Sequence, residues 1–166
     1  KRLAALLQPL EQRADDQPVG VLDRLDLLLG IAHVPGLIRR LDVDQHEVMV
    51  VEGVGGLLVP ILERYYVSDL IQRLGLRTIV VTRPTLGTIN HTLLTIRVAR
   101  AEGIEVSGIV VNHHAKFKIG VAERLNPEML ESLSNVPLLG EVPHLGELRG
   151  RPPGVEVFEE IANRLG

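Results

Sequence analysis

The stretch VMVVEGVGGLLVP, residues 48–60, places a carboxylate and a cluster of glycines between two apolar runs. Glu52 ends the first run, and Gly53, Gly55 and Gly56 follow it. A carboxylate at the end of a buried strand can hold Mg²⁺, directly or through water, while neighbouring glycine N–H groups approach phosphate oxygens. Alternatively, Glu52 caps a nearby helix or pairs with an arginine. The glycines match neither G-x-x-x-x-G-K-[ST] nor G-x-G-x-x-G, so by themselves they are a weak signal.

The stretch LGTINHT, residues 86–92, is typical of a helix that begins beside a ligand. Gly87 allows the backbone to come close to a bound molecule. The first N–H groups of a helix, here those of residues 88–90, have no intrahelical partner and attract an anion. The alternative is that the side chain of Thr88 or Asn90 simply caps the helix.

Polar side chains also follow other apolar runs. Asn112 ends the run EVSGIVVN, and its amide offers both the donor and the acceptor that an adenine edge needs. An Asx-type turn explains this asparagine equally well. His113 and His114 are adjacent, so in an extended chain they point in opposite directions, which favours a surface loop over a metal site. The other histidines show no metal-ligand spacing.

The elements that must position these residues alternate between two patterns. Short apolar runs predict buried strands at residues 47–52, 77–83, 105–112 and 136–143. Helical spacing or helix-end signals predict helices at residues 1–13, 21–41, 68–75, 87–103, 126–134 (with Pro127 at the first helical position) and 155–166. This alternation indicates a single α/β domain, residues 1–166, with a parallel sheet. Ligands bind beyond the carboxyl ends of such strands, so the polar strand ends should meet at one edge.

Composition narrows the class of function. The chain has 18 basic and 21 acidic residues, a net charge of −3 and 2% aromatic residues, which argues against nucleic-acid binding. It has no cysteine, so disulfides and thiolate sites are excluded. No apolar run approaches the roughly 20 residues of a membrane span and no signal peptide is visible, so we expect a cytoplasmic protein. The start at Lys1, inside an expected helix, suggests that an N-terminal segment is missing.

Four motifs, taken in order, resemble those of dethiobiotin synthetase. They are VVEGVGGLLVP, TLGTINHTLLT, GIVVN and LLGEVPHL, and they cover roughly residues 48–145, whereas residues 1–47 match only vaguely. The resemblance implies a three-layer, P-loop NTPase-like fold and an ATP- and Mg²⁺-dependent ligase of biotin biosynthesis. Its substrates would be 7,8-diaminopelargonate and CO₂, and it would act as a homodimer. The intermediates are anionic, which suits Mg²⁺ and backbone N–H groups as stabilisers.

Carried over residue by residue, the resemblance implies a role for each motif. It implies that Glu52 is a metal ligand and that the catalytic phosphate and substrate site is lined by Gly53, Gly55 and Gly56. The substrate carboxylate would bind, across the dimer interface, to Gly87, Thr88, Ile89 and Asn90. The adenine base of ATP would bind to Asn112, and the walls of its site would be Pro143, His144 and Leu145.

The start of the sequence departs from the family's pattern. The family begins with a strand and a glycine-rich loop that ends in Gly-Lys-Thr, but none of the 16 glycines here precedes a lysine. The family's second acidic metal ligand and its carbamate-activating lysine have no counterpart, and His113 stands where aspartate is frequent. Either the chain is a fragment, or its N-terminal half is another chain, or it is a degenerate relative that binds without catalysis.

Two consequences follow from this departure. Without the family's first strand, which is central in the sheet, two strand edges would be exposed. Without the Walker A loop, the chain alone is expected to be inactive, and whether it is an enzyme stays open. The alternative function is a non-catalytic, synthetase-like regulatory or ligand-binding domain, like those fused to some phosphate acetyltransferases. The GTINHT helix start matches the family's carboxylate site, which favours a synthetase.

Overall fold

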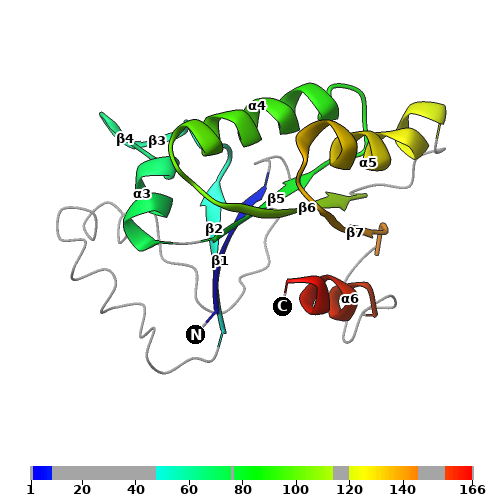
Figure 1. Cartoon of the computed structure of the whole chain (residues 1–166). Helices are drawn as coiled ribbons and strands as arrows, with labels where there is room; N and C mark the ends of the chain where they lie inside the picture. Colours follow the sequence, from blue (N-terminus) through cyan, green and yellow to red (C-terminus); the bar gives the residue numbers. More distant parts are fainter. Residues whose placement is uncertain (1, 9–47, 76, 114–119, 146–155, 166) are drawn as a thin grey trace.

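The computed structural model describes residues 2–8, 48–75, 77–113, 120–145 and 156–165, and these form a layered α/β fold (Figure 1). The sheet has the order β2-β1-β5-β6-β7, and all of its pairings are parallel. Its strands are β1 (Arg2–Gln8), β2 (Val48–Val54), β5 (Arg77–Thr82), β6 (Val106–Asn112) and β7 (Leu138–Val142). The predicted parallel α/β sheet is therefore confirmed.

Helices cover both faces of the sheet. They are α3 (Val67–Leu74), α4 (Thr88–Ala101), α5 (Val121–Ser134) and α6 (Glu156–Arg164). Figure 1 shows α4 and α5 on one face and α6 on the opposite face. A small antiparallel hairpin of β3 (Pro60–Leu62) and β4 (Tyr65–Tyr66), which the sequence reading did not predict, precedes α3. Among the helices described, none is long and apolar enough to cross a membrane.

The alternation of side chains along the strands divides the core between the two faces. Along β5, Val80 packs under α4 and α5, whereas Ile79 packs toward α6. The cluster under α4 and α5 consists of Val80, Ile96, Ile109, Val111, Leu130 and Val136, and the cluster toward α6 consists of Ile79, Val110, Leu139, Val142 and Ile161. Thr82, two residues after Val80, therefore faces α4, which decides what it can contact.

β1 corrects two expectations about the start of the chain. A helix was predicted for residues 1–13, but Arg2–Gln8 form a strand. In its register Leu6 lies opposite Glu52 of β2 and Ile79 of β5, so β1 lies between these two strands and pairs with an edge of each. The periodicity was misleading because a short apolar run bounded by a proline suits a buried strand as well as a helix. The helix predicted at 21–41 lies outside the described residues.

The start of α5 was also predicted wrongly. The sequence placed Pro127 at the first position of a helix beginning at residue 126, but the helix begins at Val121 after the N-cap Gly120. Proline removes only one N–H donor from the helix ladder, and packing can hold the helix through it. The earlier start brings Asn126 into the helix, where it is 7% exposed.

Candidate functional site

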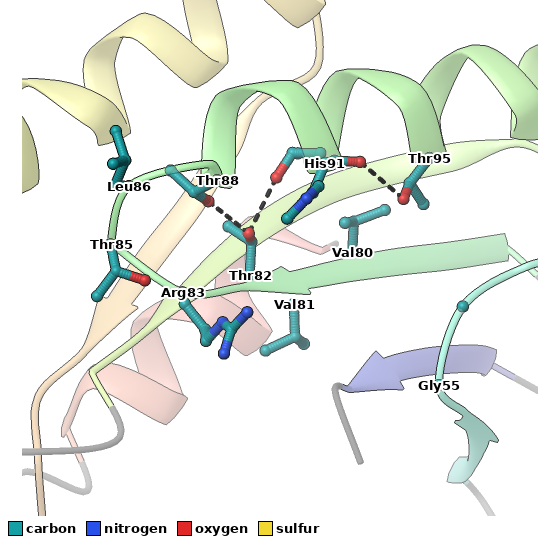
Figure 2. A pocket seen from close by; sticks show the side chains of 12 residues that line it. Gly55, Val80, Val81, Thr82, Arg83, Thr85, Leu86, Thr88, His91 and Thr95 are labelled. Carbon is teal, nitrogen blue, oxygen red and sulfur yellow. Dashed lines mark hydrogen bonds between the residues drawn. The ribbon is translucent and has the colours of Figure 1, made fainter. Parts of the chain in front are cut away.

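The carboxyl end of β5 and the first turns of α4 border an open pocket of about 230 Å³ (Figure 2). Two glycines from the turn after β2 approach it from the other side. The lining residues are Gly55, Gly56, Val80, Val81, Thr82, Arg83, Thr85, Leu86, Thr88, His91, Thr92 and Thr95. The predicted meeting of strand ends at one edge is thus present for β2 and β5.

Three buried threonines tie β5 to α4 at this pocket. The Oγ1 atoms of Thr82 and Thr88 are 2.6 Å apart, and Thr92 Oγ1 donates to Thr82 Oγ1 at 2.9 Å (Figure 2). These residues, which we call the threonine cluster, are 9%, 4% and 2% exposed for Thr82, Thr88 and Thr92. Their hydrogen bonds join the two ends of the loop of residues 83–87, because Thr82 precedes the loop and Thr88 and Thr92 follow it. These bonds fix where α4 begins.

The start of α4 depends on the backbone conformation of Gly87. This residue is the N-cap and has φ = 94°, a left-handed conformation that favours glycine. No side chain caps the helix, so the alternative that Thr88 or Asn90 is a cap is wrong. The ring of His91 lies over Gly87: a Cβ placed on this glycine would be 3.4 Å from His91 Cε1. The backbone at this point therefore carries no capping hydrogen bond, and the His91 ring is the side chain next to it.

The N–H groups of the first turn are only partly available. His91 N–H makes the first helical bond, to Gly87 O at 3.0 Å. Thr88 N–H donates to Thr85 O at 3.1 Å, so the expectation that this donor is free is wrong. For Ile89 and Asn90 the structure shows no N–H bond to any described residue. Two adjacent donors thus remain at the positive end of the helix dipole.

A residue of α5 also anchors the loop of residues 83–87, although it lies far along the chain. Asn126 of α5 donates from Nδ2 to Pro84 O at 2.7 Å. Both Asn126 and Pro84 are buried. The loop between β5 and α4 is consequently anchored by β5, α4 and α5 together.

Glu52 lies within β2 rather than after it, because the strand continues to Val54. The side chain of Glu52 is exposed, and the chain turns at Gly55, which has φ = 76°. Among the described residues no group of three or more His, Cys, Asp or Glu side chains could hold a metal. A single carboxylate nevertheless suits Mg²⁺, which commonly takes one or two carboxylates and completes its shell with water and phosphate oxygens. The metal role of Glu52 stays a prediction.

The residues predicted to hold the nucleotide base come together at the ends of β6 and β7. Asn112 lies opposite Val142, and His113 N–H donates to Val142 O at 2.9 Å. Pro143 and His144 are exposed just beyond, while Leu145 packs against the core cluster toward α6. None of these residues lines the pocket beside α4. The carboxyl edge of the sheet therefore has two separate groups of predicted site residues, one at the pocket and one at the ends of β6 and β7.

His113 is more than the surface-loop residue that the sequence suggested. Its Nε2 lies 3.0 Å from Glu141 Oε2, and its side chain is 18% exposed. This pair joins the ends of β6 and β7 next to Asn112. This pairing could not be predicted from the sequence, because the two residues are 28 positions apart and meet only through strand pairing.

Comparisons with known proteins decide the family. A sequence model described as "AAA domain" matches residues 5–151, most of the chain. The chain belongs to this family. Part of the chain is similar to ATP-dependent dethiobiotin synthetase BioD of Bacillus velezensis. The two are 50% identical over 102 residues, which make up 61% of this chain and 43% of that protein. The synthetase of the same name from Thermodesulfovibrio yellowstonii is 46% identical over 111 residues, 63% of this chain and 46% of that protein.

These relatives confirm the resemblance to dethiobiotin synthetase that the four motifs suggested, although the matched part spans less than half of each relative. Among solved structures, the Pyrococcus furiosus cell division ATPase MinD is similar with a TM-score of 0.53 at 18% identity. That match covers 80% of this chain and 56% of the MinD chain. At this identity it shows the fold alone, and it confirms the expected P-loop NTPase-like architecture.

Sequence reasoning placed Thr82 at the polar end of a strand but missed its contacts, and it missed Thr92, His91 and Asn126 as residues of the site. The i, i+4 spacing of Thr88 and Thr92 places both on one face of the helix, and this could have been noticed. The contribution of Thr82 depends on how α4 crosses β5, and that of Asn126 on a contact 42 residues away. Neither contact has a local sequence signal.

Proposed function

We propose that this chain carries the substrate- and nucleotide-binding part of an ATP-dependent dethiobiotin synthetase, which closes the ureido ring of dethiobiotin from 7,8-diaminopelargonate and CO₂. The observation that carries the proposal is the start of α4, which borders the pocket and has no capping side chain. The relatives that bear this name support it, since they match about three-fifths of the chain at high identity.

In the proposed site, the substrate carboxylate lies at the start of α4. The N–H groups of Ile89 and Asn90 would donate to it, and the helix dipole would contribute roughly 0.3–1 kcal/mol. Gly87 leaves room for the approach, and the exposed Asn90 side chain offers another donor. We further propose that the protein is a homodimer in which this helix start serves the substrate of the partner subunit.

The nucleotide would occupy the rest of the sheet edge. The amide of Asn112 would hydrogen-bond the adenine edge, with Pro143, His144 and Leu145 as walls. The turn at Gly55 and Gly56 would present backbone N–H groups to the substrate and to phosphate oxygens. Glu52 would hold Mg²⁺, and the bound cation would supply neutralisation of the phosphate charge.

The reaction asks the chain mainly for positioning. CO₂ adds to one amine to give a carbamate, the carbamate oxygen attacks the γ-phosphorus of ATP and displaces ADP, and the second amine then attacks the carbamoyl carbon and expels phosphate. Holding the distant carboxylate at α4 fixes where both amines lie, so that the two attacks become intramolecular in effect. The 166 residues contain no Gly-Lys-[ST] loop, so we propose that another polypeptide segment supplies the cradle for the γ-phosphate.

Calorimetric titration of the purified chain with diaminopelargonate and with MgATP tests the proposal. We expect both ligands to bind, and diaminopelargonate to lose affinity when its carboxyl group is replaced by a methyl group. Adding the remaining part of the B. velezensis relative as a separate chain should then allow dethiobiotin to form, detected by mass spectrometry. Failure of the chain to bind either ligand would contradict the proposal.

A further inference from the structure

We infer that the Thr88 hydroxyl donates a hydrogen bond to an anionic oxygen of the ligand at the start of α4, and that Thr82 and Thr92 are positioning residues that orient it. The inference rests on the proposed function, in which this oxygen belongs to the substrate carboxylate. It adds a side-chain contact to a site otherwise built from backbone N–H groups.

Counting hydroxyl hydrogens gives the first step. The threonine cluster has three hydroxyl hydrogens but only two internal hydrogen bonds, one between Thr82 and Thr88 and one from Thr92 to Thr82. One hydrogen is therefore left over. The structure shows no other bond from these three hydroxyls to a described residue, and all three line the pocket. A buried donor without a partner is costly unless a ligand or water accepts from it.

Either hydroxyl can be the donor in the bond between Thr82 and Thr88, and the spare hydrogen lies on Thr88 when Thr82 donates. Thr92 is the donor to Thr82, so Thr82 uses one lone pair as an acceptor. If Thr82 then donates to Thr88, the three hydroxyls form a head-to-tail chain in which each bond polarises the next. The chain ends at Thr88, the first residue of α4, adjacent to the unpartnered N–H groups of Ile89 and Asn90. An anion held by those two groups would select this orientation.

The structure shows no hydrogen bond from the Thr88 hydroxyl to the backbone carbonyl four residues earlier. A threonine in a helix often donates to the carbonyl four residues earlier, as Thr95 does to His91 O at 2.9 Å. For Thr88 that carbonyl belongs to Pro84, which accepts from Asn126 at 2.7 Å instead. Thr88 is thus a buried threonine that borders the pocket and whose hydroxyl contacts Thr82 rather than a carbonyl of its own helix.

Calorimetric titration of the chain with diaminopelargonate tests the inference through four variants. Thr88→Val should raise Kd about ten-fold, because a hydrogen bond to a carboxylate is lost. Thr88→Ser retains the hydroxyl and should stay within about two-fold of the original chain. Thr82→Val should raise Kd roughly three-fold, since Thr88 keeps its hydrogen but loses its orientation. The matched control is Thr78→Val, on the same strand and face, which removes a buried hydroxyl that has no partner among the described residues.

Two further ligands separate a direct contact from a structural role. For 2,3-diaminononane, in which a methyl group replaces the carboxyl group, Thr88→Val should leave Kd unchanged. An equal loss for both diamines would mean that the substitution merely damages the fold and would overturn the inference. For MgATP the Kd should also stay unchanged. A loss for MgATP alone would assign the anion to a phosphate, which overturns the carboxylate assignment.

The remaining outcomes separate the inference from the proposed function. If the original chain binds diaminopelargonate and Thr88→Val binds it equally well, the inference fails while the proposed function stands. If the original chain does not bind diaminopelargonate at all, both fail.

Discussion

At the scale of single residues, Gly87 shows how one backbone conformation sets where a helix begins beside the pocket. Its left-handed φ turns the chain from the β5–α4 loop into α4 and leaves the first turn without a capping side chain. The motif LGTINHT predicted a helix start here, and the structure confirms it. The sequence could not show that Thr88 N–H is occupied by Thr85, because that depends on the shape of the loop.

Replacing Gly87 with alanine should both destabilise the protein and weaken substrate binding. A left-handed φ costs a non-glycine residue about 1 kcal/mol, and the new Cβ would touch the His91 ring and narrow the approach. Gly103→Ala is the matched control, because Gly103 has φ = 71° at the other end of α4 with open space around its Cβ position. Both variants should unfold at lower urea concentration, but only Gly87→Ala should bind diaminopelargonate more weakly. Equal binding by both would remove Gly87 from the site.

Replacing Glu52 with glutamine should weaken Mg²⁺ binding in the presence of ATP by roughly ten-fold, with little loss of stability. The carboxylate is exposed, so the glutamine amide that replaces it stays in contact with water. Titration of Mg²⁺ into the ATP-bound chain measures the effect, and Glu63→Gln, another exposed carboxylate, serves as the control. An unchanged Mg²⁺ affinity in Glu52→Gln would show that the metal ligand lies elsewhere.

At the scale of elements, the β5–α4 loop is held by contacts that join three elements. The alternation of strands and helices was predictable from the pattern of apolar residues, and most of the predicted elements from residue 48 onward are present. The strand at Arg2–Gln8 and the early start of α5 were not, since both depend on tertiary packing rather than on local periodicity. The early start of α5 is what brings Asn126 to Pro84.

Replacing Asn126 with alanine should lower the free energy of unfolding by about 1–3 kcal/mol, because the buried Pro84 carbonyl loses its donor. Amide hydrogen exchange should also become faster at Thr88, whose N–H bond to Thr85 closes the same loop. Asn163→Ala, on the exposed face of α6, is the control for the loss of an asparagine side chain. If exchange at Thr88 stays as slow as before, α5 does not hold the loop.

At the scale of the whole molecule, the fold is P-loop NTPase-like, although the 166 residues contain no Gly-Lys-[ST] loop. The parallel sheet, the helices on both faces and the family could be inferred from four motifs and their order. The division of the edge into a pocket beside α4 and a second group at β6 and β7 could not, because it depends on how the loops pack.

The 166-residue chain by itself should show no Mg²⁺-dependent ATP hydrolysis above background. Phosphoryl transfer depends on a lysine and a backbone cradle around the γ-phosphate, and none of the chain's glycines precedes a lysine. A phosphate-release assay on protein freed of contaminating ATPases measures this. Hydrolysis that persists through purification, and disappears in Glu52→Gln, would show that the chain holds its own cradle.

The central claim is that one sheet edge binds diaminopelargonate at α4 and ATP at β6 and β7. Titration of the ¹⁵N-labelled chain with each ligand, followed by amide chemical shifts, tests it most directly. We predict that diaminopelargonate shifts the amides of Ile89 and Asn90, that 2,3-diaminononane shifts them much less, and that MgATP shifts Asn112. Diaminopelargonate binding that leaves residues 87–92 unmoved would contradict the account.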